Sequence, residues 1–262
     1  MAGQAIRKQQ LDAVRTLLTK VIRAKIEGYA RETAYIPFLS RLIRDSDLLA
    51  AYSFIQSVAT SLGMSVYEQA ARVLLIKRGI PETDVQLKYK LGGQISEGQR
   101  AEIAQIVSDL SNGSLISKAE QVNRVLNARS QGTQHRPKAA IVDVFYREGG
   151  HEFYIDIKTV KPNIGDFKEY KRQLLEWIAR RNAPVNALIA LPYNPYYPEP
   201  YQRFTLKGLL VPGEEMQIGE EFWDSLAGWS IYDNLLEVFD EVGQLLHDEI
   251  IDKIKTVGAG LI

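Results

Sequence analysis

The chain has 262 residues, no cysteine, and 32 basic against 32 acidic side chains. This length is enough to bury a core, and the lack of cysteine excludes disulfides, thiolate metal sites and a cysteine nucleophile. A reducing compartment suits such a chain, so we expect a cytoplasmic protein. No window approaches the roughly 18 apolar residues of a membrane span, and we expect no membrane partner.

The zero net charge conceals an uneven distribution along the chain. Residues 199–255 contain 13 Asp or Glu but only 4 Lys or Arg, so the rest of the chain is basic. One part of the molecule is therefore suited to face phosphate groups and another to avoid them. The alternative is that the acidic segment simply forms solvated helix faces.

Helical periodicity dominates the first 80 residues and continues, after a break, to about residue 132. Gly79 and Pro81 end the first run, and residues 83–98 are interpreted as a polar connection. A polar loop at 130–138 closes this half of the chain. The predicted helices cover residues 5–26, 37–63, 65–79, 97–110 and 117–132.

The pattern changes at Ala139, where β-branched and aromatic runs of strand length begin. Three strands are predicted, at 139–147, 152–160 and 185–193, with a helix at 165–182 before the last. We therefore predict an α/β fold in which a mixed central sheet is flanked by helices. The whole chain, 1–262, is predicted to be a single domain. Its parts are a helical N-terminal region (1–80), the sheet core (139–192) and an acidic, helical C-terminal region (199–262).

Asp143, Asp156 and Lys158 interrupt two of these apolar strands. Gly149 and Gly150 favour a two-residue hairpin turn with positive φ at both positions, which would pair Glu148 with His151 and, further along, Asp143 with Asp156. Directly opposed residues project from one face with Cβ atoms roughly 4.5 to 5.5 Å apart, and Lys158 emerges on that face too. The sequence therefore predicts two facing carboxylates beside a lysine.

Facing carboxylates repel each other, and a shared divalent cation would offset the cost. Oxygen ligands suit Mg²⁺, which usually takes one or two carboxylates and completes its shell with water and substrate phosphate. These are the components of metal-assisted phosphodiester hydrolysis. The alternative is a solvated sheet face, on which Lys158 pairs with an aspartate for little net energy.

"VD" at 142–143, thirteen residues before "DIK" at 156–158, resembles the PD-(D/E)xK nuclease signature. The longer string "YIDIKTVKPNIGDFKEYKRQLLEWIARR", with "EFWDSLAG" and "YDNLLEVFDEVG" downstream, resembles type II restriction endonucleases of the TdeIII-like family from about residue 60 to near the carboxyl terminus. The resemblance implies a restriction-endonuclease-like core and Mg²⁺-dependent cutting of double-stranded DNA. It further implies a homodimer in which each subunit cuts one strand, and a cognate DNA methyltransferase as genetic partner. Nearby family members recognise short palindromes of the GGNCC type.

Residue roles follow from the same resemblance. Asp143 and Asp156 match the two metal-binding acids, and Lys158 matches the lysine that positions the attacking water. The backbone carbonyl of Ile157 would be a further metal ligand. Two positions depart from the signature, because Val142 replaces its proline and Asp156 replaces the commoner glutamate.

Other candidates surround this motif, and each has a plainer alternative role. Glu68 is a further candidate metal ligand, but Ser65 and Glu68 also have the S-x-x-E spacing of a helix-capping box. Gln173 is either a substrate-binding residue or an ordinary surface glutamine. Loops 130–138 and 193–201 are candidates for base readout. The predicted phosphate contacts, each alternatively a solvated side chain, are Arg136, Lys138, Lys161, Lys171 and Arg172.

The leading hypothesis is a site-specific, Mg²⁺-dependent type II endonuclease in which attack by a metal-activated water leaves 5′-phosphate ends. One alternative is a structure-specific DNA repair nuclease on the same core. Another, from a different class, is a non-catalytic DNA-binding protein. The three scattered histidines do not indicate a zinc site, and no glycine-rich loop precedes a lysine as ATP binding would require.

Overall fold

The computed structural model describes residues 2–158, 161–202 and 208–261. The chain divides into two compact units, a helical unit formed by Met1–Lys77 and Ile231–Ile262 and a sheet unit formed by Arg78–Ser230. The prediction of a single domain stays a prediction. The described helices include none with the length and apolar character needed to cross a membrane.

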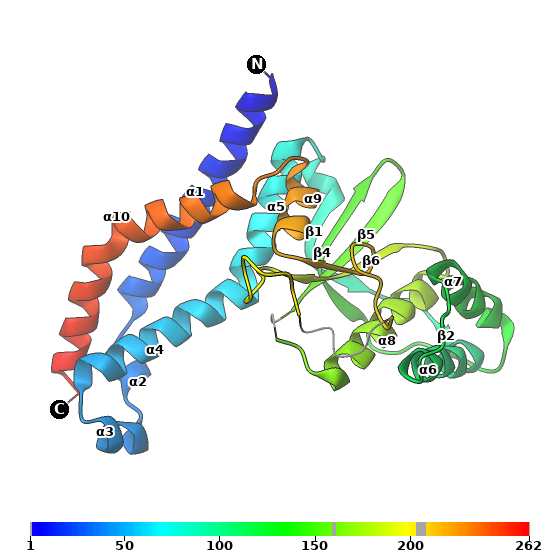
Figure 1. Cartoon of the computed structure of the whole chain (residues 1–262), viewed down its shortest axis with the longest axis horizontal. Coiled ribbons are helices and arrows are strands. Elements are labelled where there is room, and N and C mark those ends of the chain that lie inside the picture. Colours follow the sequence, from blue (N-terminus) through cyan, green and yellow to red (C-terminus); the bar gives the residue numbers. More distant parts are fainter. Residues whose placement is uncertain (1, 159–160, 203–207, 262) are drawn as a thin grey trace. The chain divides into compact units, whose positions relative to one another are not determined.

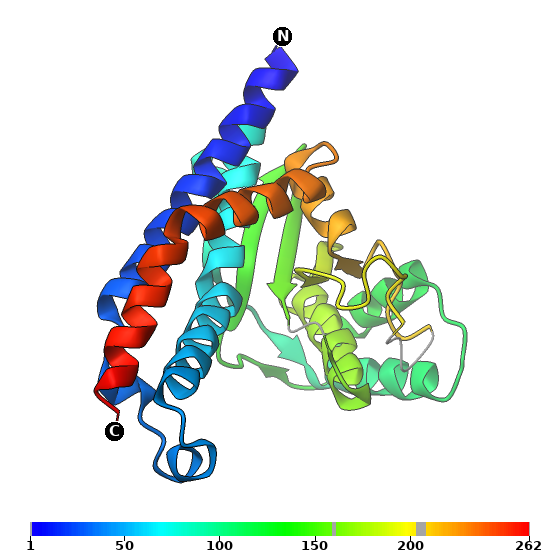
Figure 2. The same ribbon diagram turned by 60° about the vertical axis from the view of Figure 1, so that its left-hand side comes forward.

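The helical unit is built on three long helices, α1, α4 and α10, of which α10 contacts both α1 and α4 (Figures 1 and 2). The predicted helix at 37–63 is interrupted, because Arg44 adopts a left-handed conformation and the side chain of Asp45 caps the next helix by accepting from Leu48 N. A π-helical stretch, Leu62–Val66, then joins two helices without a break. The elements are α1 (Ala2–Gly28), α2 (Arg31–Ala34), α3 (Pro37–Ile43), α4 (Ser46–Ser61), α5 (Tyr67–Arg78) and α10 (Tyr232–Ala259).

The sheet unit contains a five-stranded mixed sheet in the order β1-β4-β5-β6-β7. The strands β1, β4, β5 and β6 are labelled in Figure 1. β1, β4 and β5 pair antiparallel, whereas β5, β6 and β7 pair parallel. The predicted α/β fold with a mixed central sheet and flanking helices is confirmed. The strands are β1 (Val85–Leu91), β4 (Ala140–Glu148), β5 (His151–Ile157), β6 (Asn186–Leu191) and β7 (Met216–Ile218), with a separate pair β2 (Ile95–Ser96) and β3 (Gln134–His135).

Helix α8 (Ile164–Arg181) forms the centre of the core beside this sheet. It packs against β1 and β6, and the helices α6 (Glu97–Ser111) and α7 (Lys118–Asn127) contact it in turn. Asn163 and Asp166 form a reciprocal capping box at its start, and Trp177 on its buried face lies 6.1 Å from the Tyr154 ring of β5. The cap and this apolar face fix the helix that follows the strand carrying Asp156 and Lys158.

Further segments differ from the sequence prediction, and one is the predicted loop at 130–138, which contains the short strand β3. Residues 83–98 were interpreted as a connection, but they form the edge strand β1 and the short strand β2. Val85, Leu87, Tyr89 and Leu91 alternate with polar residues, which is the period of a strand. The C-terminal region contains α9 (Glu220–Ala227) and α10 as predicted, but it also contributes β7 to the sheet. Residues 203–207 and 262 of that region lie outside the described part of the chain.

Candidate active site

Strand register brings Lys88, Asp143 and Asp156 into one row across β1, β4 and β5. The β4–β5 hairpin pairs Glu148 with His151 and continues to Val144 with Ile155, while Gly149 and Gly150 have φ values of 58° and 80°. The predicted register, symmetric about the two glycines, is confirmed as far as Val144 and Ile155. Asp143 and Asp156 are the next residues beyond this last pair, and their carboxyl groups are hydrogen-bonded to each other. On the other side of β4, the pairs Leu87–Val144 and Tyr89–Val142 place Lys88 opposite Asp143.

Asp143 is held through both of its carboxylate oxygens. Oδ2 accepts a hydrogen bond from the backbone nitrogen of Ile157 at 2.8 Å, and Oδ1 accepts one from Lys88 Nζ, also at 2.8 Å. The β4–β5 ladder ends at the pair Val144 and Ile155. Just past this pair, the side chain of Asp143 accepts the hydrogen bond of a β5 backbone N–H. The Asp143 carboxylate is therefore held from both neighbouring strands, by a backbone N–H of β5 and by the side chain of Lys88 on β1.

Asp156 is 3% exposed and is bound from two sides. Its Oδ2 lies 2.6 Å from Lys158 Nζ and also accepts a hydrogen bond from the Gln173 amide on α8. The nearly complete burial of Asp156, with Asp143 only 9% exposed, argues against the alternative of a solvated sheet face. Gln173 is therefore no ordinary surface glutamine, because it holds one of the two predicted catalytic carboxylates in place.

The two carboxyl groups titrate as a coupled pair. Burial, and then the hydrogen-bond contact with Asp143 and its charge, raise the pKa of Asp156 to about 7. Burial also acts to raise the pKa of Asp143, but hydrogen bonds from Asp156, Lys88 and the Ile157 N–H outweigh it and hold that pKa below its ordinary value. Near neutral pH the pair therefore keeps a proton for part of the time, as expected of two acids that face each other.

The chemistry of this donor set fits a magnesium ion. Both side chains offer hard oxygen ligands, and their mutual repulsion is the cost that a divalent cation would remove. Across residues 2–158, 161–202 and 208–261 no group of three or more His, Cys, Asp or Glu side chains could hold a metal. Two carboxylates are nevertheless enough for Mg²⁺, which usually keeps several waters and binds substrate phosphate.

Glu68 lies on α5 in the helical unit and is 3% exposed. The predicted capping box with Ser65 is wrong, because the preceding residues Leu62–Val66 are already helical and there is no helix start to cap. The Ser65 hydroxyl instead donates to the carbonyl oxygen of Ser61 at 3.4 Å. The role of Glu68 as a further metal ligand stays a prediction.

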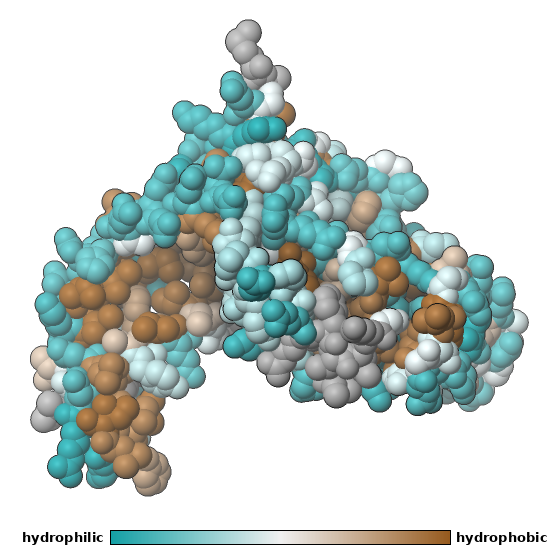
Figure 3. Space-filling view, in the orientation of Figure 1, coloured by the Kyte–Doolittle hydropathy of each residue, from teal (hydrophilic) through white to brown (hydrophobic). Residues whose placement is uncertain are grey.

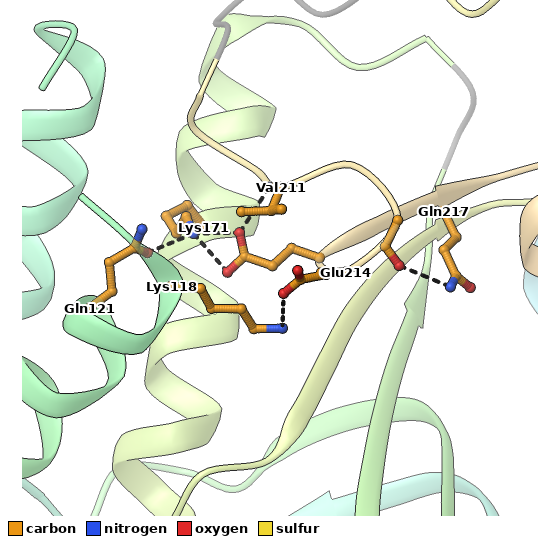
Figure 4. A network of polar contacts seen from close by, with 8 residues as sticks. Lys118, Gln121, Lys171, Val211, Glu214 and Gln217 are labelled. Atoms are coloured by element: carbon orange, nitrogen blue, oxygen red, sulfur yellow. Dashed lines mark hydrogen bonds and ion pairs between the residues drawn. The ribbon is translucent and has the colours of Figure 1, made fainter. Parts of the chain in front are cut away.

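Four of the five predicted phosphate contacts are exposed: Arg136, Lys138, Lys161 and Arg172. Lys171 is the exception, and its prediction is corrected. Its side chain has no exposed surface, and Nζ donates to Glu215 at 2.6 and 2.7 Å and to Gln121 at 2.8 Å (Figure 4). An ammonium enclosed in this way is not presented to a DNA backbone.

Lys88 is the residue of the site that sequence reasoning missed. It lies in the segment interpreted as a connection, although the alternating pattern of residues 85–91 already indicated a strand. Its backbone is left-handed, with a φ of 51° in the middle of a strand. Arg44 and Asn182 have similar φ values, 54° and 52°, but neither lies in a strand. For a residue other than glycine such a conformation costs about 1–3 kcal/mol and is common at functional sites.

The fold and the site together define a class of protein. A β-hairpin carries an acid on each strand, D-x-K ends the second strand, and a helix then leads to a parallel third strand, which is the arrangement of a restriction-endonuclease-like nuclease core. The family model "Type II restriction endonuclease, HinfI" matches residues 6–243. The chain therefore belongs to the HinfI family of type II restriction endonucleases, which are site-specific deoxyribonucleases.

Curated relatives agree with this assignment. The chain is 29% identical over 232 residues to the type II restriction enzyme HgiEI of Herpetosiphon aurantiacus and 28% identical to HgiBI of the same organism, with 83% of this chain and 81% of each relative covered. It is 25% identical to the type II restriction enzyme MjaII of Methanocaldococcus jannaschii, covering 79% of this chain and 59% of that enzyme. No solved structure matches the chain. The prediction of a type II restriction endonuclease is confirmed, and the TdeIII-like placement within it stays a prediction.

Proposed function

We propose that the chain is a Mg²⁺-dependent restriction endonuclease that acts as a homodimer, with each subunit cutting one DNA strand and leaving a 5′-phosphate end. We further propose a short palindromic target of the GGNCC type, protected in the cell by a cognate methyltransferase. The observation that carries the proposal is the buried pair Asp143 and Asp156 with Lys158 bound 2.6 Å from Asp156.

Each residue of the pair has a distinct part in this proposal. Asp143 and Asp156, with the backbone carbonyl of Ile157, would hold Mg²⁺, and Glu68 is a further candidate ligand. The bound ion would stabilise negative charge on the phosphate and lower the pKa of a water molecule. Lys158, whose side chain is 32% exposed, keeps its ammonium at the rim of the pair, where it can orient that water. Gln173 fixes Asp156, and Arg136, Lys138, Lys161 and Arg172 would contact DNA phosphates.

Lys158→Met is expected to lower single-turnover cleavage of plasmid DNA by about 10²- to 10⁴-fold, the usual contribution of a group that handles a reacting proton. DNA affinity measured with Ca²⁺ in place of Mg²⁺ should change little, because the variant keeps the acid pair and the exposed cations.

Sequencing the ends of the wild-type products would give the target and the cut position. Chelation of divalent ions should stop the reaction.

Lys161→Met serves as the matched control, since Lys161 is exposed and lies only three residues further along. It should weaken DNA binding modestly and leave the rate at saturating protein unchanged. Full cutting by Lys158→Met would remove Lys158 from the mechanism. Cutting at branched structures regardless of sequence would indicate the repair-nuclease alternative, and metal-independent binding with no nicking would indicate the non-catalytic one.

The homodimer has separate support from the surface of the helical unit. Phe38 and Leu42, one helical turn apart on α3, are 84% and 81% exposed, and Ile55 on α4 is 64% exposed. Figure 3 shows a hydrophobic area over this end of the helical unit, at its lower left. Exposed apolar groups gathered in this way commonly mark protein interfaces. A palindromic target also favours a partner of the same kind, because its symmetry mirrors that of a dimer.

Phe38→Glu with Leu42→Glu is therefore expected to convert a dimer into a monomer in sedimentation velocity. The folded content seen by circular dichroism should not fall, because both side chains are exposed. The monomer should nick single strands at a reduced rate in place of making double-strand breaks. A control change at the exposed Leu115 of the sheet unit, Leu115→Glu, should leave the dimer intact. If the double variant Phe38→Glu with Leu42→Glu stays dimeric, the dimer interface lies elsewhere on the molecule.

A further inference from the structure

Lys88 occupies an unusual position for an exposed strand lysine. It lies on the edge strand β1, directly opposite Asp143, and completes the row that Asp143 and Asp156 begin. Among the described non-glycine residues with positive φ, Arg44 and Asn182 end helices, whereas Lys88 lies inside a strand. The backbone at this position is therefore held in a strained conformation beside the acid pair.

The ammonium of Lys88 lies between the solvent and the buried carboxylates. Nζ is 2.8 Å from Oδ1 of Asp143, and the side chain is 52% exposed. The other oxygen of Asp143 is already used by the Ile157 N–H, so Lys88 binds the oxygen that the backbone leaves available. A metal ion at the acid pair would need an Asp143 oxygen, and Oδ1 is the one that a side chain can vacate.

Charge balance favours such an exchange. In the structure two ammonium groups, Lys88 and Lys158, each bind one carboxylate of the pair. A divalent cation among the same groups would add excess positive charge, which the phosphate of a DNA strand would offset. The half-exposed, flexible stem of Lys88 allows its ammonium to leave Asp143 and reach an anion a few ångströms away, since lysine is a point charge on four rotatable carbons.

We propose that Lys88 is a second lysine of the active site, which occupies Asp143 in the free protein and binds a non-bridging oxygen of the DNA phosphate when a divalent ion takes that place. This inference rests on the proposed function. It differs from a purely structural role, in which Lys88 would only fasten β1 to β4. If Lys88 had only that structural role, its loss would disturb the positions of Asp143 and Asp156. Metal binding and DNA cleavage would then both become weaker.

The two roles give opposite results for metal binding to the DNA-free protein. Lys88→Met removes a cation that competes for Asp143, so Mn²⁺ binding followed by electron paramagnetic resonance should tighten by roughly threefold to tenfold, because a neighbouring like charge is gone. Single-turnover cleavage should nevertheless fall by about 10²-fold, as on removal of one charged contact to the transition state. Lys88→Arg keeps the charge, so Mn²⁺ affinity should stay near the wild-type value and part of the cleavage should return.

Two further variants complete the design. Lys90→Met removes an exposed lysine from the same strand, and neither its Mn²⁺ affinity nor its cleavage rate should follow Lys88→Met. Lys88→Gly suits the positive φ without strain and replaces Lys88→Met if that variant does not fold. If Lys88→Met binds Mn²⁺ more weakly and also cleaves more slowly, or if neither property changes, the proposed role of Lys88 is overturned. The proposed function would not be affected by either result. A wild-type protein that neither binds Mn²⁺ nor cuts DNA would overturn the proposed function and this inference with it.

Discussion

Replacement of Asp156 with asparagine is expected to abolish DNA cleavage and, at the same time, to make the metal-free protein more stable at alkaline pH. Asparagine has the shape of a protonated aspartic acid. Its carbonyl oxygen can accept the hydrogen bonds that Lys158 and Gln173 now donate, and its amide can donate to Asp143. The variant therefore keeps the contacts of the site, loses one charged metal ligand and removes the repulsion between the two acids.

The pH dependence of the stability gain follows from the pKa of Asp156. Burial and the neighbouring Asp143 raise this pKa from an ordinary 3.8 to about 7. An acid with a raised pKa contributes stability that is present below its ordinary pKa and lost as the pH rises through its folded value. The gain from Asp156→Asn should therefore grow from pH 4 to about 7 and level off above it. Asp143, with its lowered pKa, acts in the opposite sense, because its contribution is lost as the pH falls.

The size of the gain is on the order of 2 kcal/mol, since each unit of pKa shift corresponds to about 1.4 kcal/mol and the pair shares the effect. Thermal melting with a chelator present, across this pH range, would measure it. Asp248→Asn, at an exposed position on α10, is a control that should melt as the wild type does at every pH. A lower melting temperature for Asp156→Asn at pH 8 would contradict this prediction, because the lost ion pair with Lys158 would then outweigh the repulsion between the acids. Retained cleavage would show that Asp156 is not required.

Local rules were sufficient to predict the hairpin that carries the acid pair. Gly149 and Gly150 determine the turn, and the turn determines which residues of β4 and β5 face each other. Helix α8 was equally predictable from its period, from Asp166 near its start and from the two arginines at its end. These features depend on neighbours within about twenty residues, so the sequence contains all the information that they need.

Other features depend on contacts that a local pattern does not contain. The spacing of Ser65 and Glu68 is that of a capping box, but the same spacing also occurs inside a continuous helix, which is what packing produces here. The strand β1 had a clear alternation, yet its importance comes from lying beside β4, with Lys88 opposite Asp143 across 55 residues of sequence. Lys171 belongs by sequence to a basic cluster, and only its distant partner Glu215 shows that it is buried.

Lys171→Met is expected to destabilise the sheet unit by about 3–5 kcal/mol, because it leaves the Glu215 carboxylate buried without its cation. Glu215 is 3% exposed, and besides Lys171 it accepts the backbone N–H of Val211 at 3.0 Å (Figure 4). Lys171 also bonds Gln121 at 2.8 Å, so one ammonium joins α7, α8 and the segment before β7. Burial lowers the pKa of Lys171, and the charge of Glu215 opposes that shift.

The double variant Lys171→Met with Glu215→Gln should recover most of this loss, since glutamine can still accept from Val211 and no unpaired charge remains. Urea unfolding would measure all three proteins. Arg172→Met, at the next residue of α8, is the matched control, because its exposed pair with Glu169 should be worth less than about 1 kcal/mol. Below its unfolding transition, Lys171→Met should bind DNA as the wild type does. Weakened DNA binding with unchanged stability would instead return Lys171 to the phosphate-contacting surface, and would require the buried pair of Lys171 and Glu215 to become exposed when DNA binds.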